Sequence, residues 1–219
     1  MREYPKKVMP RRNLLMEIID MYLYGASGHA KVIIDILESM GVNIAGLIDD
    51  NKEVKQLMEY PVEHNFHGQE PLIVSIGSNR IRKIVAERIN GVYGQAISLH
   101  AVVSSRSKIG EGTVVMQGAI VQSDSIIGKH CIINTGASVD HECRLDDYVH
   151  VSPHSTLCGN VMIGEGSWIG AGATIIQGIT IGRWCVIGAG SVVTHNVPDG
   201  YLAVGNRCKL IKKINQELL

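Results

Sequence analysis

Large aliphatic residues recur at every sixth position over residues 103–198. Sixteen consecutive hexads each begin with Val, Ile or Leu, without an insertion or a deletion. The fifth position of each hexad is also restricted, to Ser, Thr, Ala, Cys, Val or Ile. This pattern predicts short strands whose large and small side chains share one interior, joined by sharp corners where Gly and Asp accept turn dihedrals.

Three hexads close one triangular coil of 18 residues. Since neighbouring strands stack at roughly 4.8 Å, the sixteen hexads predict a prism of a little over five coils, about 25 Å tall. Ile and Val, 28 and 22 residues against 14 Leu, suit such buried ladders. Each residue is therefore expected to stack on the residue 18 positions later.

Before the repeat, the hydrophobic pattern changes to an alternation of strands and helices. Strands are predicted at Asp20–Tyr24, 43–50 and 71–79, and helices at 30–41 and 80–90. This order predicts a small Rossmann-like α/β unit with a parallel sheet. The chain accordingly divides into an N-terminal tail (1–19), a Rossmann-like unit (20–96), a β-helix (97–200) and a C-terminal tail (201–219).

Composition narrows the class of protein. Lys and Arg (21) balance Asp and Glu (21), so no nucleic-acid partner is indicated. The five cysteines lack metal or CxxC spacing, which predicts a reducing cytoplasm and no metal. No apolar run approaches the ~18 residues that span a bilayer, and the N-terminus lacks a secretory signal, so no membrane insertion is expected.

Two loops of the α/β unit have the composition of a ligand site. Residues 25–28 (GASG) open a helix, where backbone N–H groups receive phosphate, although the full dinucleotide fingerprint is absent. Asp49 follows about twenty residues later, where an acidic residue can bind ribose hydroxyls. The alternative is a tight turn beside an exposed acidic strand end, with His29 as a surface helix residue.

One histidine of the repeat stands out. His141 is third in the hexad VDHECR, so it projects outward at a corner between Asp140 and Glu142, which can orient its imidazole. Gly159 lies 18 residues later and is expected to stack on it, leaving room beside the ring and an accessible N–H. A general base beside an oxyanion donor suits acyl transfer. His130, His154 and His195 are expected at surface corners.

The hexads resemble those of the hexapeptide-repeat acyltransferases. Together with GASGH, LIDD and SIGSNRIR, they resemble the nucleotide-sugar acetyltransferases, above all the UDP-4-amino-sugar N-acetyltransferases of bacillosamine biosynthesis. The sialic-acid O-acetyltransferases and GDP-perosamine N-acetyltransferases share the pattern. The resemblance covers roughly residues 20–213 and implies a left-handed parallel β-helix, acetyl-CoA as co-substrate, a UDP-sugar acceptor, and a homotrimer with active sites between subunits.

The resemblance also implies roles for individual residues. Ser27, Gly28 and His29 would contact the diphosphate or the sugar. Asp49 and Asp50 would contact the ribose or the sugar, and Gly77 would contact the nucleotide. His141 would be the base, Glu142 its acidic partner and Gly159 the oxyanion donor, with Asn134 near the amine and His150 at acetyl-CoA.

The stacked residues Ala171 and Ala189 would let pantetheine approach the backbone, or merely satisfy packing. Related enzymes usually end in a Gly-x-Pro-Ala-Lys segment, whereas this chain has Asn206, Arg207 and Cys208 there. The basic residues of this segment are expected either to contact the phosphates of the cofactor or to form a solvated tail. They are Arg207, Lys209, Lys212 and Lys213.

Other functions fit the sequence less well. A zinc hydratase on this helix needs a third histidine beside His150 and His154. A sugar-1-phosphate nucleotidyltransferase needs a much larger N-terminal domain. A nucleotide-sugar-binding scaffold without activity stays open, and release of coenzyme A distinguishes it from an enzyme.

Overall fold

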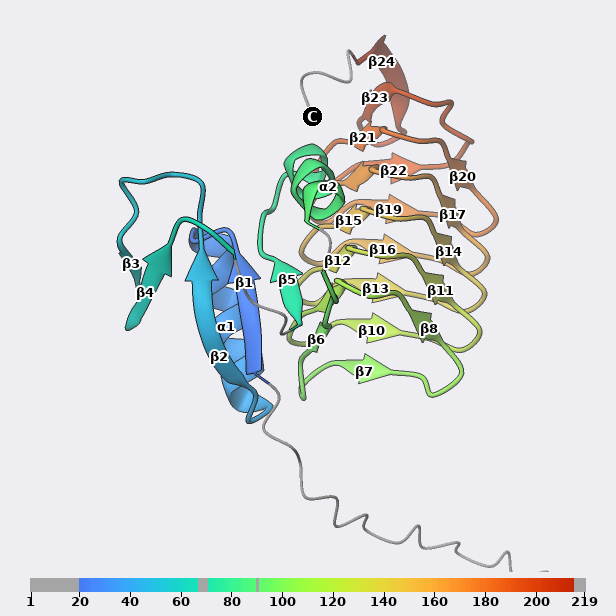
Figure 1. Cartoon of the computed structure of the whole chain (residues 1–219). Coiled ribbons are helices and arrows are strands. Elements are labelled where there is room, and N and C mark those ends of the chain that lie inside the picture. Colours follow the sequence, from blue (N-terminus) through green and yellow to red (C-terminus); the bar gives the residue numbers. More distant parts are fainter. Residues whose placement is uncertain (1–19, 67–70, 90, 215–219) are drawn as a thin grey trace, which may run out of the picture.

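The computed structural model describes residues 20–66, 71–89 and 91–214. The predicted N-terminal tail (1–19) lies outside this range. Residues 20–89 form an α/β domain with a five-stranded sheet of order β3-β4-β2-β1-β5 (Figure 1). Its elements are β1 (Asp20–Tyr24), α1 (Gly28–Ser39), β2 (Asn43–Ile48), β3 (Gln56–Leu57), β4 (Tyr60–Glu63), β5 (Leu72–Val74) and α2 (Asn79–Arg88).

The parallel core of this sheet agrees with the prediction, because β1 pairs in parallel with both β2 and β5. Its details differ. The hairpin of β3 and β4 was not predicted from the sequence, since its short strands are mostly exposed and lack an apolar alternation. The strand expected at 71–79 ends at Val74, because residues 75–78 form the loop that leads into α2.

Residues 96–193 form a parallel β-helix with three faces, as predicted. Face 1 consists of β6 (Ala96–Ile97), β9 (Val114–Val115), β12 (Ile132–Ile133), β15 (His150–Val151), β18 (Trp168–Ile169) and β21 (Val186–Ile187). Face 2 consists of β7 (Val102–Val103), β10 (Ile120–Val121), β13 (Ser138–Val139), β16 (Thr156–Leu157), β19 (Thr174–Ile175) and β22 (Val192–Val193). Face 3 consists of β8 (Lys108–Ile109), β11 (Ile126–Ile127), β14 (Arg144–Leu145), β17 (Met162–Ile163) and β20 (Thr180–Ile181).

The interior confirms the expected use of the hexad. One coil places Ile133, Val139 and Leu145 inside as large residues, each at most 3% exposed. The small residues Ala137 and Cys143 of the same coil are fully buried beside them. From β6 to β22 every ladder joins residues 18 apart, so stacked positions can be read from the sequence.

The α/β domain packs against the outer surface of face 1 (Figure 1). Val114 and Ile132 point outward from the β-helix and are buried in one cluster with Met21 and Ile33 of the α/β domain. The two parts of the chain therefore share an apolar core, which fixes the carboxyl edge of the small sheet relative to the coils.

The sequence predicts a C-terminal tail over 201–219, but much of that segment is strand. β23 (Tyr201–Val204) extends face 1 by pairing in parallel with β21, and β24 (Lys209–Lys213) pairs with it in antiparallel. Residues 215–219 lie outside the described part of the chain. Among the described residues, no helix is long and apolar enough to cross a membrane.

Candidate active site

The predicted phosphate turn lies at the carboxyl edge of the small sheet. Gly25 has φ of +110°, and a Cβ there would lie 2.6 Å from the Ile76 side chain, so this turn requires glycine. Ser27 and Gly28 follow as exposed residues at the start of α1. A Cβ at Gly28 or Gly77 would meet nothing within 4 Å, so their glycines leave open space beside the backbone.

Both predicted ribose-binding carboxylates already have partners in the fold. Asp49 accepts hydrogen bonds from the backbone N–H of Ala26 (2.7 Å) and of Asn51 (2.8 Å). Asp50 accepts from the Tyr24 hydroxyl (2.5 Å) and from Arg88 (2.9 Å). Because Asp49 holds the turn that precedes Ser27, it shapes the predicted phosphate turn.

His29 and Gly77 of this edge face His150 of the β-helix. Burial, and then the charges of Arg82 and His29, lower the pKa of His150 to about 3. Burial and Arg82 likewise lower the pKa of His29 to about 4. Both imidazoles are therefore neutral at pH 7. Within the described residues, no partner meets Nε2 of His29 or Nδ1 of His150, although both atoms are buried.

His150 connects this edge to face 1 of the β-helix. Its Nε2 lies 3.0 Å from Nδ2 of Asn134, which is the residue expected near the reacting amine. Its ring stacks on Trp168 with 5.5 Å between centroids and 6° between planes. Trp168 was not among the predicted site residues, yet it lies 18 positions after His150 and the stacking register would have found it.

A mostly apolar pocket of about 400 Å³ continues from this pair along the upper coils. The two alanines expected at the pantetheine arm, Ala171 and Ala189, both line it and are exposed. Its lining residues are His150, Ser152, Pro153, Trp168, Gly170, Ala171, Val186, Ile187, Gly188 and Ala189. The structure thus brings together His29, Gly77, Asn134, His150 and both alanines.

The predicted base lies at another corner. Nδ1 of His141 is 3.1 Å from the Glu142 carboxylate, while Asp140 accepts from the His141 backbone N–H instead of the ring. The ring lies against Gly159, where a Cβ would be 2.5 Å from Cε1 and 2.7 Å from Nε2. No acceptor among the described residues meets the Gly159 N–H, and Gly159 itself is buried beneath the His141 ring.

A single chain does not join the two groups of residues. His141 and Gly159 follow face 2, at the corner toward face 3, whereas Asn134, Ala171 and Ala189 follow face 1, at the corner toward face 2. Face 2 separates the two corners. Because the His141 side chain is 58% exposed, it is accessible to a ligand or to another molecule.

The expectation that His130 lies at a surface corner is wrong. Its ring is 4% exposed and packs between Tyr93 and Tyr148, at centroid distances of 4.5 Å and 5.3 Å. The α/β domain covers this corner, which the repeat pattern alone does not reveal. His154 and His195 are exposed, as predicted.

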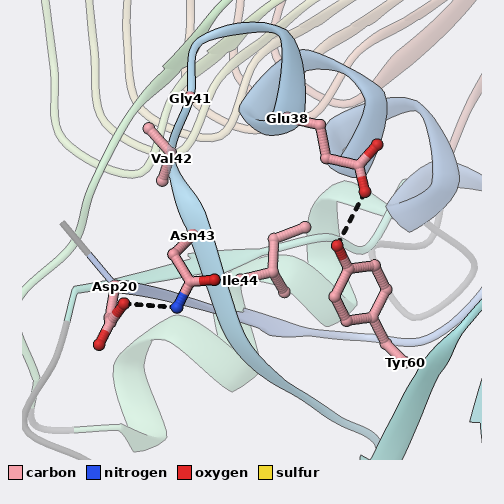
Figure 2. Close-up of a pocket in the computed structure, with 7 residues that line it drawn as sticks. All are labelled: Asp20, Glu38, Gly41, Val42, Asn43, Ile44 and Tyr60. Carbon is pink, nitrogen blue, oxygen red and sulfur yellow. Dashed lines mark hydrogen bonds between the residues drawn. The ribbon is translucent and has the colours of Figure 1, made fainter. Parts of the chain in front are cut away.

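A second hollow, of about 820 Å³, lies at the amino ends of β1 and β2, away from these residues (Figure 2). Its polar side chains are paired with one another, Asn43 with Asp20 (2.6 Å) and Tyr60 with Glu38 (2.8 Å). Ligands of parallel sheets bind at the carboxyl ends of strands instead. Across the described residues, no group of three or more His, Cys, Asp or Glu could hold a metal ion.

Comparison with known proteins gives family matches in both parts of the chain. Residues 20–89 match the PglD N-terminal domain. Residues 160–195 match the bacterial transferase hexapeptide family of six repeats. Among curated proteins, uncharacterized protein L142 of Acanthamoeba polyphaga mimivirus is 33% identical over 101 residues, which are 43% of this chain. The chain spans only 21% of the length of that relative.

Solved structures match nearly the whole described chain. A histidine-to-alanine mutant of GDP-perosamine N-acetyltransferase from Caulobacter crescentus, in complex with CoA and GDP-perosamine, is 38% identical with a TM-score of 0.84. The match covers 88% of this chain and 97% of that one. The acetyltransferase domain of PglB from Neisseria gonorrhoeae is 35% identical with a TM-score of 0.83, covering 88% and 100%. This chain therefore belongs to the family of hexapeptide-repeat nucleotide-sugar N-acetyltransferases.

Proposed function

We propose that this protein transfers the acetyl group of acetyl-CoA to the amine of a nucleotide-linked 4-amino-4,6-dideoxy sugar. The observation that carries the proposal is the approach of the Gly77 backbone to His150, beside an apolar pocket lined by small residues. It supports a nucleotide site at this edge, next to a groove for a thioester. Similar proteins are solved with CoA and GDP-perosamine, and with acetyl coenzyme A.

The acceptor nucleotide occupies the carboxyl edge of the small sheet. Its diphosphate lies at Ser27 and Gly28, where the start of α1 presents backbone N–H groups and the positive end of the helix dipole. Gly77 lets the nucleotide approach the second loop. Asp49 and Asp50 take the ribose or sugar while they keep their bonds to the turn and to Arg88. UDP is the nucleotide we favour, with GDP as the alternative.

Acetyl-CoA lies in the pocket of the upper coils. Ala171 and Ala189 lack side chains beyond Cβ, so the pantetheine arm can hydrogen-bond to the backbone beside them. Neutral His150 lines this pocket and contacts the acetyl donor, while its Nε2 faces Asn134. No metal takes part in this proposal.

His141 serves as the general base. The Glu142 carboxylate at Nδ1 holds the tautomer whose Nε2 lone pair is free, and it stabilises the imidazolium that forms. As Nε2 takes the amine proton, the amine nitrogen bonds to the thioester carbonyl carbon. The Gly159 N–H then receives the negative charge that develops on the oxygen. The carbon–sulfur bond breaks, and coenzyme A leaves as the thiol with a proton returned to its sulfur.

A complete site requires two copies of the chain. The base and the oxyanion donor lie at one corner, and the cofactor pocket lies at the next, so one subunit supplies each half. A homotrimer closes three such sites by cyclic symmetry, and the flat faces of a short prism favour self-association. We assign the reaction to the cytoplasm, in keeping with free cysteines throughout the described chain.

The direct test is coenzyme A release from acetyl-CoA with the purified protein. Acceptors are UDP-4-amino-4,6-dideoxy sugars, GDP-perosamine and sialic acid, and products are identified by mass spectrometry. We expect turnover with a nucleotide-linked amine and a kcat at least ~10²-fold lower for His141→Ala. Turnover only with a sugar hydroxyl contradicts N-acetylation. Nucleotide-sugar binding without coenzyme A release indicates a scaffold, and an unchanged rate in His141→Ala removes the base assignment.

A further inference from the structure

Arg82, on α2, is buried without a carboxylate partner. Arg82 is 1% exposed, and every oxygen that accepts a hydrogen bond from it is neutral. Burial lowers the pKa of Arg82 to about 10, so the guanidinium is still charged at pH 7. A buried charge is costly unless it is well bonded, and an apolar residue of similar volume is often more stable at such a position. Stability alone is therefore a weak reason for an arginine here.

One side of the guanidinium bonds to the β-helix. Arg82 Nε donates to the His130 carbonyl (2.8 Å), and Nη2 donates to the Tyr148 carbonyl (3.0 Å). Asn79, whose Oδ1 accepts from Arg82 Nη2 (2.7 Å), donates in turn to the Gly166 carbonyl (3.0 Å). His130, Tyr148 and Gly166 occupy equivalent positions in three successive coils, so the start of α2 bonds to three stacked carbonyls.

The other side of the guanidinium bonds to the loop between β5 and α2. Arg82 Nη1 donates to the carbonyls of Ile76 (2.9 Å) and Gly77 (3.1 Å). Gly77 is the residue whose backbone faces His150. Asn79 Nδ2 also approaches the Ser167 carbonyl (3.3 Å), which accepts the backbone N–H of His150. Arg82 thus joins this loop (residues 75–78), which we call the nucleotide loop, to the coils that carry His150.

We infer that Arg82, with Asn79, is a positioning residue that sets the height of the nucleotide loop along the β-helix. The inference rests on the proposed function, in which the nucleotide at Gly77 and the acetyl donor at His150 must be held in one geometry. A shift of the loop by one carbonyl would misplace the amine by about one strand spacing, roughly 4.8 Å. Misplacement by about 1 Å can already cost 10²-fold in rate.

The test compares Arg82→Met, Arg82→Lys and Asn79→Ala with the wild-type protein. We expect both Arg82 variants to lose about 10- to 100-fold in kcat/KM for the nucleotide sugar. The lysine variant keeps the charge but has no planar fork to reach four carbonyls, so it should not restore activity. Affinity for coenzyme A, measured by calorimetry, should stay within about twofold, because the pocket residues are untouched. Asn79→Ala should act in the same direction with a smaller loss.

Lys83→Met is the matched control. Lys83 also connects α2 to the β-helix, through Glu165 (2.8 Å), but its side chain is 30% exposed and has a carboxylate partner. We expect this variant to keep its kinetic constants. An equal loss in Lys83→Met would mean that domain contact in general matters, and would overturn the assignment of Arg82. Full activity of a folded Arg82→Met or Arg82→Lys would overturn it as well.

Binding measurements separate this inference from the proposed function. If the wild-type protein acetylates no amino sugar, the proposed function fails. The affinities of the wild-type protein and the variants for UDP and GDP then test the positioning role of Arg82. Weaker nucleotide affinity in folded variants with unchanged coenzyme A affinity supports the positioning role. Nucleotide affinity equal to that of the wild type contradicts it. If Arg82→Met does not fold, Asn79→Ala is assessed by the same measurements.

Discussion

At the scale of single residues, the contact between His141 and Gly159 is the tightest constraint on the proposed chemistry. The imidazole occupies the place that a side chain at 159 would fill. The backbone at Gly159 does not have a positive φ, so alanine is compatible with it. An alanine there changes the position of the ring without straining the turn, which makes it a clean probe of geometry.

We therefore expect Gly159→Ala to fold and to lower kcat by at least ~10-fold, because a 2.5 Å contact must displace the His141 ring. Steady-state kinetics and a thermal melt check this. Gly46→Ala is the control, since its Cβ would press on the Tyr22 ring at 2.9 Å, far from the proposed base. Control and variant should both lose some stability, but only Gly159→Ala should lose turnover. Equal kcat values would remove the role of this contact.

At the scale of elements, the ladder of face 1 builds the proposed cofactor side of the site. β15 and β18 pair in parallel, which places Trp168 beside His150. The indole N–H donates to the Ser152 hydroxyl (2.7 Å) and fixes the ring as one wall of the pocket. Strand pairing thus positions the residues of the proposed cofactor pocket, just as the corner after face 2 positions the proposed base.

Replacing Trp168 by alanine removes this wall and the stacking on His150. An aromatic stack contributes about 0.5–1.5 kcal/mol, so we expect KM for acetyl-CoA to rise about 2- to 10-fold. KM for the nucleotide sugar should change less. Trp184→Ala is the control, because that indole packs over Gly166 and lies outside the pocket. A Trp168→Ala enzyme with unchanged KM for acetyl-CoA would contradict the placement of the cofactor.

At the scale of the whole molecule, the proposed site is divided between two corners of the prism. A subunit that lacks His141 keeps its cofactor pocket, and a subunit that lacks His150 keeps its base. In the proposed homotrimer, mixed assemblies of two inactive variants would therefore contain some complete sites, whereas a site within one chain would never be restored.

Co-expressed His141→Ala and His150→Ala chains should regain up to about a third of wild-type activity, because every mixed cyclic trimer contains one complete site out of three. Activity is measured on mixed oligomers separated by two affinity tags. Each variant expressed alone is the control and should stay inactive. Mixed oligomers without activity would place both halves of the site in one subunit or remove one of the two roles.

Much of the fold is predictable from the sequence because the β-helix repeats one local rule. Each hexad supplies one large and one small interior residue, so the coils and their register follow from counting. The same counting predicts that Gly159 stacks on His141. The hairpin of β3 and β4 and the strands after Tyr201 escape it, because they lack the hexad pattern and their pairing is decided by neighbouring strands.

The candidate site likewise contains one part that the sequence predicts and one part that only the structure shows. By itself, the sequence determined the β-helix, its interior and the stacking of residues 18 apart, since these depend on short-range periodicity. Only the tertiary structure decided that His29 and Gly77 face His150, that His130 is covered, and that Arg82 bonds to stacked carbonyls. These contacts join segments with no fixed spacing along the chain, and they are set by the apolar surface that face 1 shares with the α/β domain.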